Sequence, residues 1–319
     1  MAVTIRSIGL PALLVVCSTA SVTVAGRPAT VAFRIDGPRV AITIGGRPFA
    51  VYVFSDPAIR RPYFTAVKAP TGQQVTRHHP PRPGVDSTDH ATMHPGIQLA
   101  FGDLGGADFW RNKASVIHEE FVEKPRGGPA TGRFTVRQRY VAGKRTVCRE
   151  VCRHTVLVRP HGILLTYDSQ FWSDESDFAF GDQEEMGLSV RVDRELRVRG
   201  GRGVITSSEG RRNEKAVWGR QALWCAYGGI RGKNHVGAIL MPFPGNFRAC
   251  WFHARDYGFL AANPFGRRAF TRGKASRVVV KRGRKFRLRY GVLIHGTPAD
   301  KPVEPGVAYA DYLDVIGNK

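Results

Sequence analysis

The sequence predicts an all-β protein that folds as one large antiparallel β-sandwich. Most segments are short runs rich in β-branched and aromatic residues with turn residues between them, as expected of many strands joined by tight connections. The chain contains 36 glycines and 20 prolines, which supply those turns. Only residues 306–315 place apolar side chains at helical spacing. Because no repeat of fixed period and no clear linker divides the chain, we expect a single domain.

The N-terminal 25 residues resemble a secretory signal peptide. Arg6 precedes an apolar run without charge, and small residues follow that run. Ala20 and Ala25 both suit a cleavage site, and Pro11 within the run disfavours the alternative of an uncleaved membrane anchor. We therefore expect residues 1–25 to be removed, residues 26–319 to form the mature domain, and the protein to be exported to the periplasm or the extracellular space. No other stretch is long and apolar enough to span a bilayer.

The predicted elements follow one another as hairpins and single strands. The Gly45-Gly46 pair predicts a hairpin over residues 38–54. Residues 56–83 are polar and proline-rich and predict a loop with one short strand. A loop that carries His90 and His94 then leads into a strand at 97–101. Further on we expect strands at 134–141, 146–158, 161–172, 187–192, 195–199, 218–228 and 235–243, a loop at 200–214, and a last hairpin of strands 275–280 and 285–294.

Four cysteines remain after the leader: Cys148, Cys152, Cys225 and Cys250. Within one strand, Cys148 and Cys152 would lie roughly 13 Å apart, too far to bridge each other. We expect buried free thiols, and a Cys225–Cys250 disulfide is left open by the export prediction.

The strong positive charge predicts either anionic partners or, as the favoured interpretation, arginines scattered over a solvated surface. The net charge is +22 and the sequence pI is about 10.5. Such a balance favours an acidic polysaccharide or an anionic envelope surface. We expect no nucleic-acid partner, because the chain carries none of the usual nucleic-acid-binding motifs. Residues 267–289 contain many cations and no acid, which predicts either a docking face for an anionic polymer or a solvated outer hairpin.

Three clusters distant in sequence combine the side chains that a sugar site needs. They are the histidine loop at 86–110, the acidic turn at 181–187, and the segment 251–266. Aromatic rings can cover the apolar face of a sugar, polar side chains can bind its hydroxyls, and a histidine paired with a glutamate can transfer protons at neutral pH. We predict His94, Glu185 and His253 as catalytic residues, with Glu184 competing for the role of Glu185, and Arg61, Tyr63, His90, Arg255, Tyr257 and Asn263 as substrate-binding residues.

A metal site is the less favoured interpretation of the same residues. His90, His94, His253 and Glu185 could form a histidine/carboxylate site. The H-x-x-x-H spacing ends in Pro95-Gly96, so no helix is secured that would align the two imidazoles. We therefore predict no metal ligand and no cofactor, with a metal ion left as the alternative. The chain also lacks a G-x-S-x-G elbow and a phosphate-binding P-loop.

Several longer motifs resemble the PmoA-like family of uncharacterised bacterial proteins. The resemblance extends from about residue 60 to residue 296. Its most specific motifs are those at 89–96 and 251–266. The matching motifs are R-P-Y-F (61–64), D-H-x-x-x-H-x-G (89–96), P-T-G-x-x-V-T-R (70–77), G-A-D-F-W (106–110), E-M-G-L-S-V-R-V (185–192), W-G-R-x-A-L-W-C (218–225) and W-F-H-A-R-D-Y-G-F-L-A-A-N-P-F-G (251–266).

A looser similarity links the pattern to the galactose-mutarotase-like supersandwich, an all-β fold. In mutarotases a histidine donates a proton to the ring oxygen and a glutamate removes one from the anomeric hydroxyl. The similarity implies that His94 or His253 is the acid and Glu185 the base. We predict an exported carbohydrate-active protein with epimerase-, lyase- or hydrolase-like acid/base chemistry. The alternatives are a non-catalytic carbohydrate-binding protein of the envelope and, less favoured, a histidine-site metalloenzyme.

Overall fold

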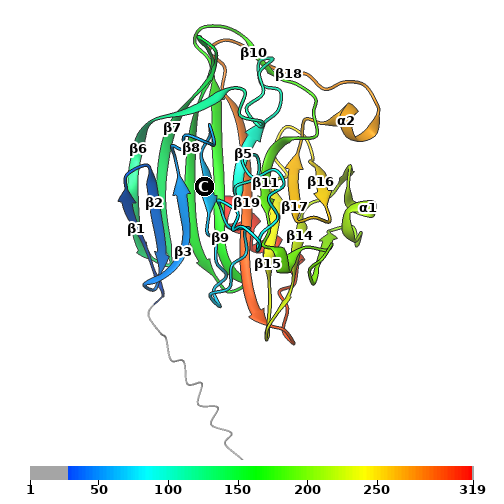
Figure 1. The fold of residues 1–319 in the computed structure, drawn as a ribbon. Helices are drawn as coiled ribbons and strands as arrows, with labels where there is room; N and C mark the ends of the chain where they lie inside the picture. The colour runs from blue at the N-terminus through cyan, green and yellow to red at the C-terminus, as the bar shows by residue number, and fades with distance from the viewer. Residues whose placement is uncertain (1–27, 318–319) are drawn as a thin grey trace, which may run out of the picture.

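Two antiparallel sheets form the structure, a computed structural model that describes residues 28–317 (Figure 1). The predicted leader, residues 1–25, lies outside the described residues. The first sheet runs, in spatial order, through β1 (Thr30–Asp36), β2 (Arg39–Ile44), β3 (Arg47–Val53), β4 (Tyr63–Thr65), β5 (Ile97–Phe101), β11 (Met186–Arg191), β17 (Phe259–Asn263), β16 (Trp251–Arg255) and β13 (Arg220–Gln221).

The second sheet packs face to face with the first. Its order is β6 (Ser115–Pro129), β7 (Thr131–Ala142), β8 (Arg145–Arg159), β9 (Gly162–Trp172), β19 (Phe286–Pro298), β15 (Asn234–Pro242), β14 (Cys225–Arg231) and β12 (Gly203–Ser207). The end of β6 also pairs with the start of β1, and this pairing joins the two sheets along one edge.

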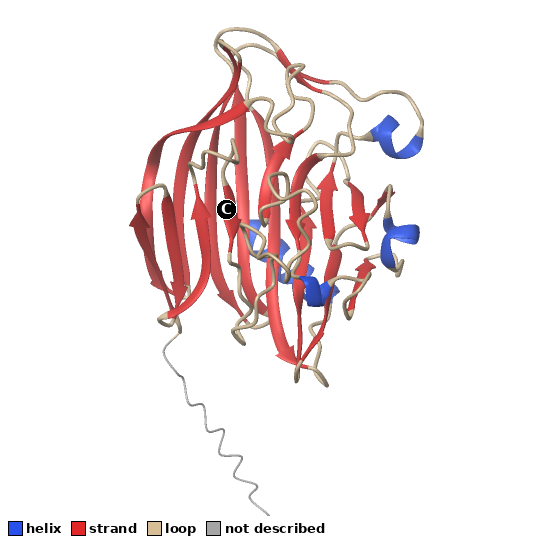
Figure 2. Ribbon diagram, in the orientation of Figure 1, coloured by secondary structure: helices blue, strands red, loops and turns tan. Residues whose placement is uncertain are grey.

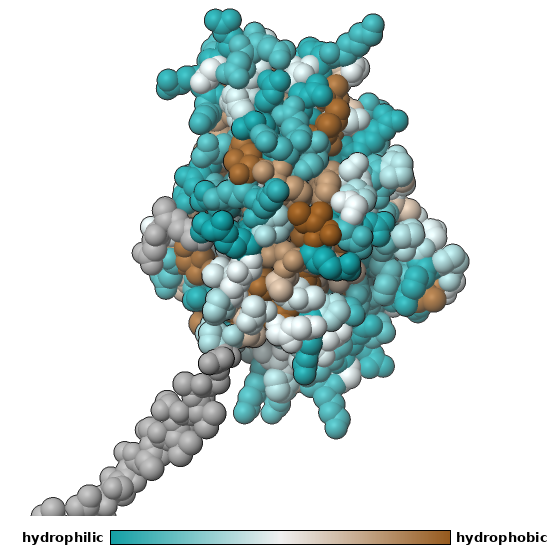
Figure 3. All heavy atoms as spheres, turned by 90° about the vertical axis from the view of Figure 1, so that its left-hand side faces the viewer, coloured by the Kyte–Doolittle hydropathy of each residue, from teal (hydrophilic) through white to brown (hydrophobic). Residues whose placement is uncertain are grey.

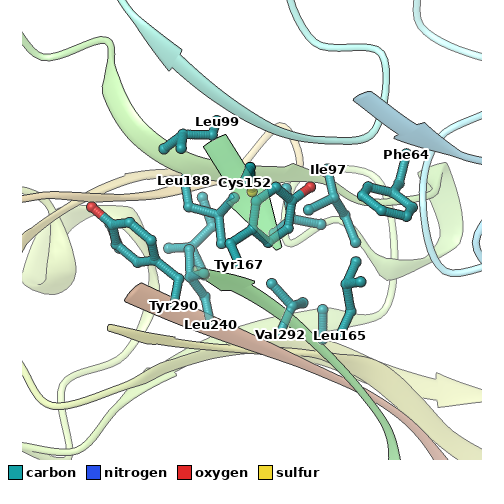
Figure 4. Packing of buried hydrophobic residues seen from close by; sticks show 14 of the residues in the cluster. Phe64, Ile97, Leu99, Cys152, Leu165, Tyr167, Leu188, Leu240, Tyr290 and Val292 are labelled. Carbon is teal, nitrogen blue, oxygen red and sulfur yellow. The ribbon is translucent and has the colours of Figure 1, made fainter. Parts of the chain in front are cut away.

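The hydrophobic core fills the space between the sheets. In β5 the side chains of Ile97, Leu99 and Phe101 belong to the core cluster, whereas Gln98 and Ala100 lie on the opposite face. This alternation is what an extended strand imposes. Figure 4 shows Leu99 and Leu188 of the first sheet facing Leu240 and Tyr290 of the second. The core residues therefore fix which side chains of the first sheet point outward.

Helices are few and lie outside the sheets (Figure 2). The described part contains α1 (Asn213–Val217), α2 (Arg267–Thr271), α3 (Pro305–Gly317) and a 3-10 turn at Arg194–Leu196. Tyr312 of α3 packs with Leu164 and Leu293, so α3 covers part of the outer face of the second sheet. None of the helices in the described residues has the length and hydropathy of a membrane-crossing segment. On the β1 and β6 edge of the molecule, hydrophobic side chains form only small patches in a hydrophilic surface (Figure 3).

The predicted fold class is confirmed, and most of the predicted elements are present. The hairpin at 38–54, the short strand in 56–83, the strand at 97–101 and the final helix all occur. The strands at 134–141, 146–158, 161–172, 187–192 and 235–243 correspond to β7, β8, β9, β11 and β15, and the stretch 218–228 is divided between β13 and β14. The four cysteines are free and buried, so Cys225 and Cys250 form no disulfide.

Three local predictions are wrong. Residues 195–199 form a 3-10 turn and its exit, because the Asp193 carboxylate accepts the Glu195 amide and caps a turn there. The predicted loop at 200–214 contains β12 and the start of α1. The last hairpin does not form: β18 (Val278–Val280) pairs with β10 (Phe178–Phe180), whereas β19 pairs with β9 and β15. Adjacent strands in sequence therefore join different sheets.

The core packing predicts a large effect of one truncation. Leu188 is fully buried in the core cluster. Leu188→Ala removes packed methyl groups and leaves a cavity, so we expect the free energy of unfolding to fall by about 2–5 kcal/mol. Ile230 is half exposed on β14, and Ile230→Ala is the control, with an expected change of about 0.5 kcal/mol. Urea denaturation measures both, and equal losses in the two variants would contradict this packing.

Candidate functional site

Polar and aromatic side chains gather on the outer face of the first sheet. Across neighbouring strands, Gln98 aligns with Ser189, Ser189 with Ala261, and Ala261 with His253. The next row holds Arg191, Phe259 and Arg255. Because side chains of one row share a face, strand pairing places these residues side by side, away from the core. Trp110 packs with Phe259 on this face.

Two buried arginines hold the histidine loop against this face. Arg77 donates from Nη1 to the carbonyl oxygens of Ser87 (3.0 Å) and Asp89 (2.7 Å), and from Nη2 to those of His90 (3.3 Å) and His94 (2.9 Å). The guanidinium therefore binds four carbonyl oxygens of one loop. Because the Arg77 amide also donates to the Arg191 carbonyl, these bonds tie the main chain of residues 87–94 to β11.

Arg61, predicted to bind substrate, instead supports the same loop. Its Nη2 donates to the Met93 carbonyl (2.6 Å), its Nε to Gln98 Oε1 (2.9 Å) and its Nη1 to Asn112 Oδ1 (2.7 Å). The side chain is 2% exposed. Its donors are taken up by protein groups, so it is a positioning residue in this structure.

The two histidines of the loop lie in a stack of rings. His90 has a positive φ of 50° and stacks between His94 (5.0 Å between ring centroids) and Tyr257 (5.7 Å). His94 is buried and stacks on Phe259 at 4.2 Å. His90 is exposed and Tyr257 is partly exposed, so the edges of these two rings reach the surface.

The Arg191–Asp89 ion pair contacts both His90 and Tyr257 of the ring stack. Arg191 Nη2 donates to both oxygens of Asp89 (2.9 and 3.0 Å), and its guanidinium lies 4.5 Å from the centre of the Tyr257 ring. Asp89 Oδ2 is 3.0 Å from His90 Nδ1. The charge pair, the imidazole and the phenol ring therefore form one connected unit.

A histidine–glutamate pair lies at the other side of Phe259. The ring centroids of His253 and Phe259 are 5.2 Å apart, and His253 Nε2 lies 3.5 Å from Glu184 Oε2. Arg255 donates from Nη2 to the same glutamate oxygen at 3.0 Å and from Nη1 to Glu214 Oε1 at 3.2 Å. Phe259 therefore contacts both His94 and His253.

The hydrogen bond at Nδ1 determines what His253 can do at Nε2. Nδ1 lies 3.3 Å from the Glu184 carbonyl oxygen, which can only accept, so Nδ1 carries a proton. In the neutral ring Nε2 is then an acceptor, and it faces a carboxylate oxygen that is also an acceptor. Nε2 is buried and has no hydrogen-bond donor among the described residues. A hydroxyl group or a shared proton between Nε2 and Oε2 would satisfy both atoms.

Burial holds the two inner imidazoles in their neutral form. For His253, burial and then the charge of Arg255 lower the pKa to about 3. For His94, burial and then the charge of Arg191 lower the pKa well below its ordinary value. Both rings are therefore neutral near pH 7, and neither is an imidazolium that could donate a proton. This differs from the acid role that the mutarotase similarity implied for either histidine.

Glu184, the competing candidate, is the glutamate beside His253. Glu185 lies next in the chain and points to another partner: its Oε2 is 2.6 Å from Arg111 Nη2. Arg111 also binds Asp108 at 3.1 Å. Successive side chains around a strand start diverge, so only one of the two glutamates reaches the imidazole. Glu185 remains partly exposed at the edge of the site.

Two further predicted binding residues are engaged by the protein. Asn263 is fully buried; its Nδ2 donates to the carbonyls of Gln183 (2.7 Å) and Glu184 (3.0 Å), which sets the main chain of the acidic turn. Tyr63 is buried in a separate small cluster and donates to Asp56 Oδ2 at 2.7 Å. Of the nine predicted residues, the structure brings together His90, His94, Glu185, His253, Arg255 and Tyr257 around this face, with Asn263 as support, and it leaves Tyr63 elsewhere.

Sequence reasoning missed Arg191, which links the histidine loop to the sheet. The sequence predicted a strand at 187–192 and assigned Arg191 to no site. Gly187, Ser189 and Arg191 alternate with Met186, Leu188 and Val190, and this alternation was the available signal that Arg191 lies on the outer face.

The predicted metal alternative has no counterpart at the histidines. Among residues 28–317, the group with metal-ligand spacing is His78, Asp86 and Asp193, with ligand atoms within 4.8 Å of one another. Arg82 Nε already bonds Asp86 Oδ2 at 3.0 Å, and Arg231 Nη1 lies 3.6 Å from Asp193 Oδ1. The positive charges of Arg82 and Arg231 therefore neutralise the two carboxylates without a metal ion.

A cavity of about 480 Å³ lies away from this site. It is bordered by the β2–β3 turn, residues 68–72 and the β8–β9 turn, and its lining includes Arg47, Lys68 and His161. None of the predicted site residues lines it. The chemistry described above therefore belongs to the outer face of the first sheet and not to this cavity.

The fold and site define an all-β sandwich protein with a histidine–glutamate pair on the outer face of one sheet. Residues 39–303 match the model of a family of unknown function, DUF6807, and the chain belongs to that family. The resemblance to PmoA-like proteins stays a prediction. Among curated proteins no match was found.

Solved structures include distant galactose-mutarotase-like proteins. One from Lactobacillus casei ATCC 334 has a TM-score of 0.39 and 11% identity, and the match covers 83% of this chain and 100% of that chain. A galactose mutarotase related enzyme from Lactobacillus acidophilus has a TM-score of 0.34 and 12% identity, with 86% of this chain and 100% of that chain covered.

The Asp89–Arg191 contact predicts a pH-dependent contribution to stability. Burial raises the pKa of Asp89, but hydrogen bonds from Ser87 and His90 and the charges of Arg191 and Arg77 lower it more, to about 2. An unfolded aspartate has a pKa of about 3.9. The ionised carboxylate therefore stabilises the fold above about pH 4, and this contribution is lost as the pH falls toward about 2.

Comparing wild type with Asp89→Asn by urea denaturation measures this contribution. We expect the difference in unfolding free energy to be constant between about pH 5 and 7 and to shrink between about pH 4 and 2. Asp36→Asn is the control, because Asp36 is exposed and lies 3.7 Å from Arg34 only. A difference that does not change with pH would show that Asp89 is not held in its charged form.

Proposed function

We propose that this protein is an exported carbohydrate-active protein that transfers protons to and from a sugar on the outer face of its first sheet. The observation that carries the proposal is the 3.5 Å approach of His253 Nε2 to Glu184 Oε2, with Nε2 buried and lacking a donor. Nε2 is the acceptor that lacks a hydrogen, because Glu184 Oε2 already accepts from Arg255, and a sugar is a source of hydroxyl groups. Export is supported by the leader-like character of residues 1–25.

The geometry suggests a role for each member of the pair. Nδ1–H of His253 is held by the Glu184 carbonyl, so the ring is oriented with Nε2 free to accept a proton from the sugar. The imidazolium that forms would be stabilised by the Glu184 carboxylate beside it. Arg255 fixes that carboxylate through Nη2. Return of the proton to the sugar would complete an epimerase-like reaction. In a lyase-like reaction the proton would go to the glycosidic oxygen that departs as its C–O bond breaks, and in a hydrolase-like reaction the pair would take the proton from a water molecule that replaces the leaving group.

The groups around the pair suit the rest of a sugar ring. The partly exposed edges of the His90 and Tyr257 rings can contact the apolar side of a pyranose. The Glu185–Arg111 pair lies at the edge of the site, is partly exposed, and supplies an acceptor and a donor for hydroxyl groups. The proposed reaction requires no metal ion or organic cofactor.

A second candidate function is non-catalytic carbohydrate binding. It is favoured by the ion pairs that already neutralise both glutamates, Glu184 by Arg255 and Glu185 by Arg111. In such a site the carboxylates would serve as hydrogen-bond acceptors only. The two functions share a ligand class, so they differ in turnover and not in binding.

Matched glutamate variants separate the two candidates. The purified mature chain is screened with sugars and polysaccharides for reducing ends, keto sugars and unsaturated products, with and without a chelator. We expect chelator-resistant turnover, which Glu184→Gln lowers by about 100-fold in kcat with ligand affinity retained. Glu185→Gln is the control and should change KM more than kcat, because Glu185 does not contact His253.

The outcomes decide between the candidates. An unchanged kcat in Glu184→Gln would contradict the proposed proton transfer. Retention of a glycan by both wild type and Glu184→Gln, without any turnover, would establish the non-catalytic alternative. Loss of activity on chelation would reinstate the metalloenzyme interpretation.

A further inference from the structure

A dense run of positive charge lies beside the candidate site. We name residues 267–285 the basic segment; it includes α2, β18 and the turn that follows. It contains no aspartate or glutamate. Its cations, nearly all exposed, are Arg267, Arg268, Arg272, Lys274, Arg277, Lys281, Arg282, Arg284 and Lys285.

The acids that contact this segment fix its main chain and leave most of its charge unpaired. Asp182 accepts the main-chain amides of Arg268 (2.9 Å), Ala269 (3.0 Å) and Ser276 (2.6 Å). Asp177 accepts Lys281 Nζ (2.8 Å). Within the described residues, no carboxylate lies within 4.0 Å of the charged nitrogens of the other eight cations. The segment is therefore held in shape while its guanidinium and ammonium groups remain available.

One aromatic side chain connects the segment to the site. The Phe270 ring of α2 lies 5.4 Å from the Trp218 ring, 6.5 Å from the Trp251 ring and 6.2 Å from the His253 ring, measured between centroids. Phe270 is buried, so α2 rests on the site through this contact. Figure 1 shows α2 at the same side of the molecule as β16 and α1. Arg267 and Arg268 precede Phe270 in α2, so the α2 end of the basic segment adjoins the His253–Glu184 pair.

We propose that the basic segment binds an acidic polysaccharide and places one of its sugar units at the His253–Glu184 pair. The inference rests on the proposed function and names its substrate class. An acidic polysaccharide carries carboxylate groups for the unpaired cations and hydroxyl donors for Glu184, Glu185 and Glu214. A DNA duplex carries phosphates but no backbone hydroxyl donors, and its phosphates would meet these three carboxylates. Charge complementarity on both sides therefore favours the polysaccharide.

Binding of polygalacturonate to the mature chain tests the inference. The variant Arg268→Gln, Arg272→Gln, Lys274→Gln changes three exposed cations that make no side-chain ion pair. We expect its Kd for polygalacturonate to rise at least about tenfold, because each cation near an anionic surface contributes separately. Binding of the wild type should weaken as salt rises, since exposed charges are screened. A neutral polysaccharide of similar length should bind with little dependence on salt.

A control variant separates local charge from net charge. Lys124→Gln, Arg126→Gln, Lys144→Gln removes the same charge from exposed positions on β6 and the β7–β8 turn, far from α2 in sequence and sheet order. Its Kd should stay within about twofold of wild type. Equal weakening in both triple variants would overturn the inference, as would tighter binding of a 20-base-pair DNA duplex than of polygalacturonate.

Failure of this inference and failure of the proposed function give different results. The binding measurement needs no turnover, so it reports on the basic segment even if no reaction is found. If Glu184→Gln binds polygalacturonate like wild type and the basic-segment variant does not, the segment is the binding surface whatever the pair does. If turnover is found on neutral sugars alone and the basic-segment variant retains it, the proposed function stands and the acidic substrate class is excluded.

Discussion

The arrangement of the site depends on the burial of two guanidinium groups beneath the histidine loop. A charged group inside a protein is costly unless each donor is satisfied, and Arg77 satisfies its Nη donors with four carbonyl oxygens of residues 87–94. Burial lowers the pKa of Arg77 to about 10 and that of Arg61 to about 9, so both remain charged at neutral pH. Displacement of the loop would leave these buried donors without acceptors. The loop is therefore held in place, with His94 stacked on Phe259 and His90 on Tyr257.

The first sheet supplies the rigid support for that arrangement. Its inner face is packed against the second sheet, so the register of β5, β11, β17 and β16 is set by the core. The outer-face residues are then placed by strand pairing, which explains how His253 and Arg191 reach neighbouring rows although they are distant in sequence. Site side chains on strands are held more precisely than side chains on loops, and the loop histidines gain comparable order from the arginines.

Charge is distributed unevenly over a molecule with a net charge of +22. At the site, arginine and carboxylate side chains pair closely, as in Arg255 with Glu184 and Arg111 with Glu185. In the basic segment the cations are largely unpaired. The segment adjoins the site through Phe270 of α2, and its β18 strand pairs with β10 and not with β19. Unpaired positive charge therefore lies next to a site rich in hydroxyl-binding groups.

The sequence by itself determined the fold class and the main site motifs. Alternating apolar runs and frequent turn residues indicated a sandwich, and the strand at 97–101 and the histidine loop before it follow from local patterns of side-chain alternation and Pro-Gly punctuation. Only the tertiary structure decided which neighbour each side chain meets. Glu184 and not Glu185 faces His253, and Arg61 and Asn263 bind main-chain carbonyls of the site, because these contacts depend on strand register and on partners from 32 to 80 residues away. The local sequence predicts on which face of a sheet a side chain lies. Which residues it contacts on that face depends on the order and register of the strands in the folded sheet.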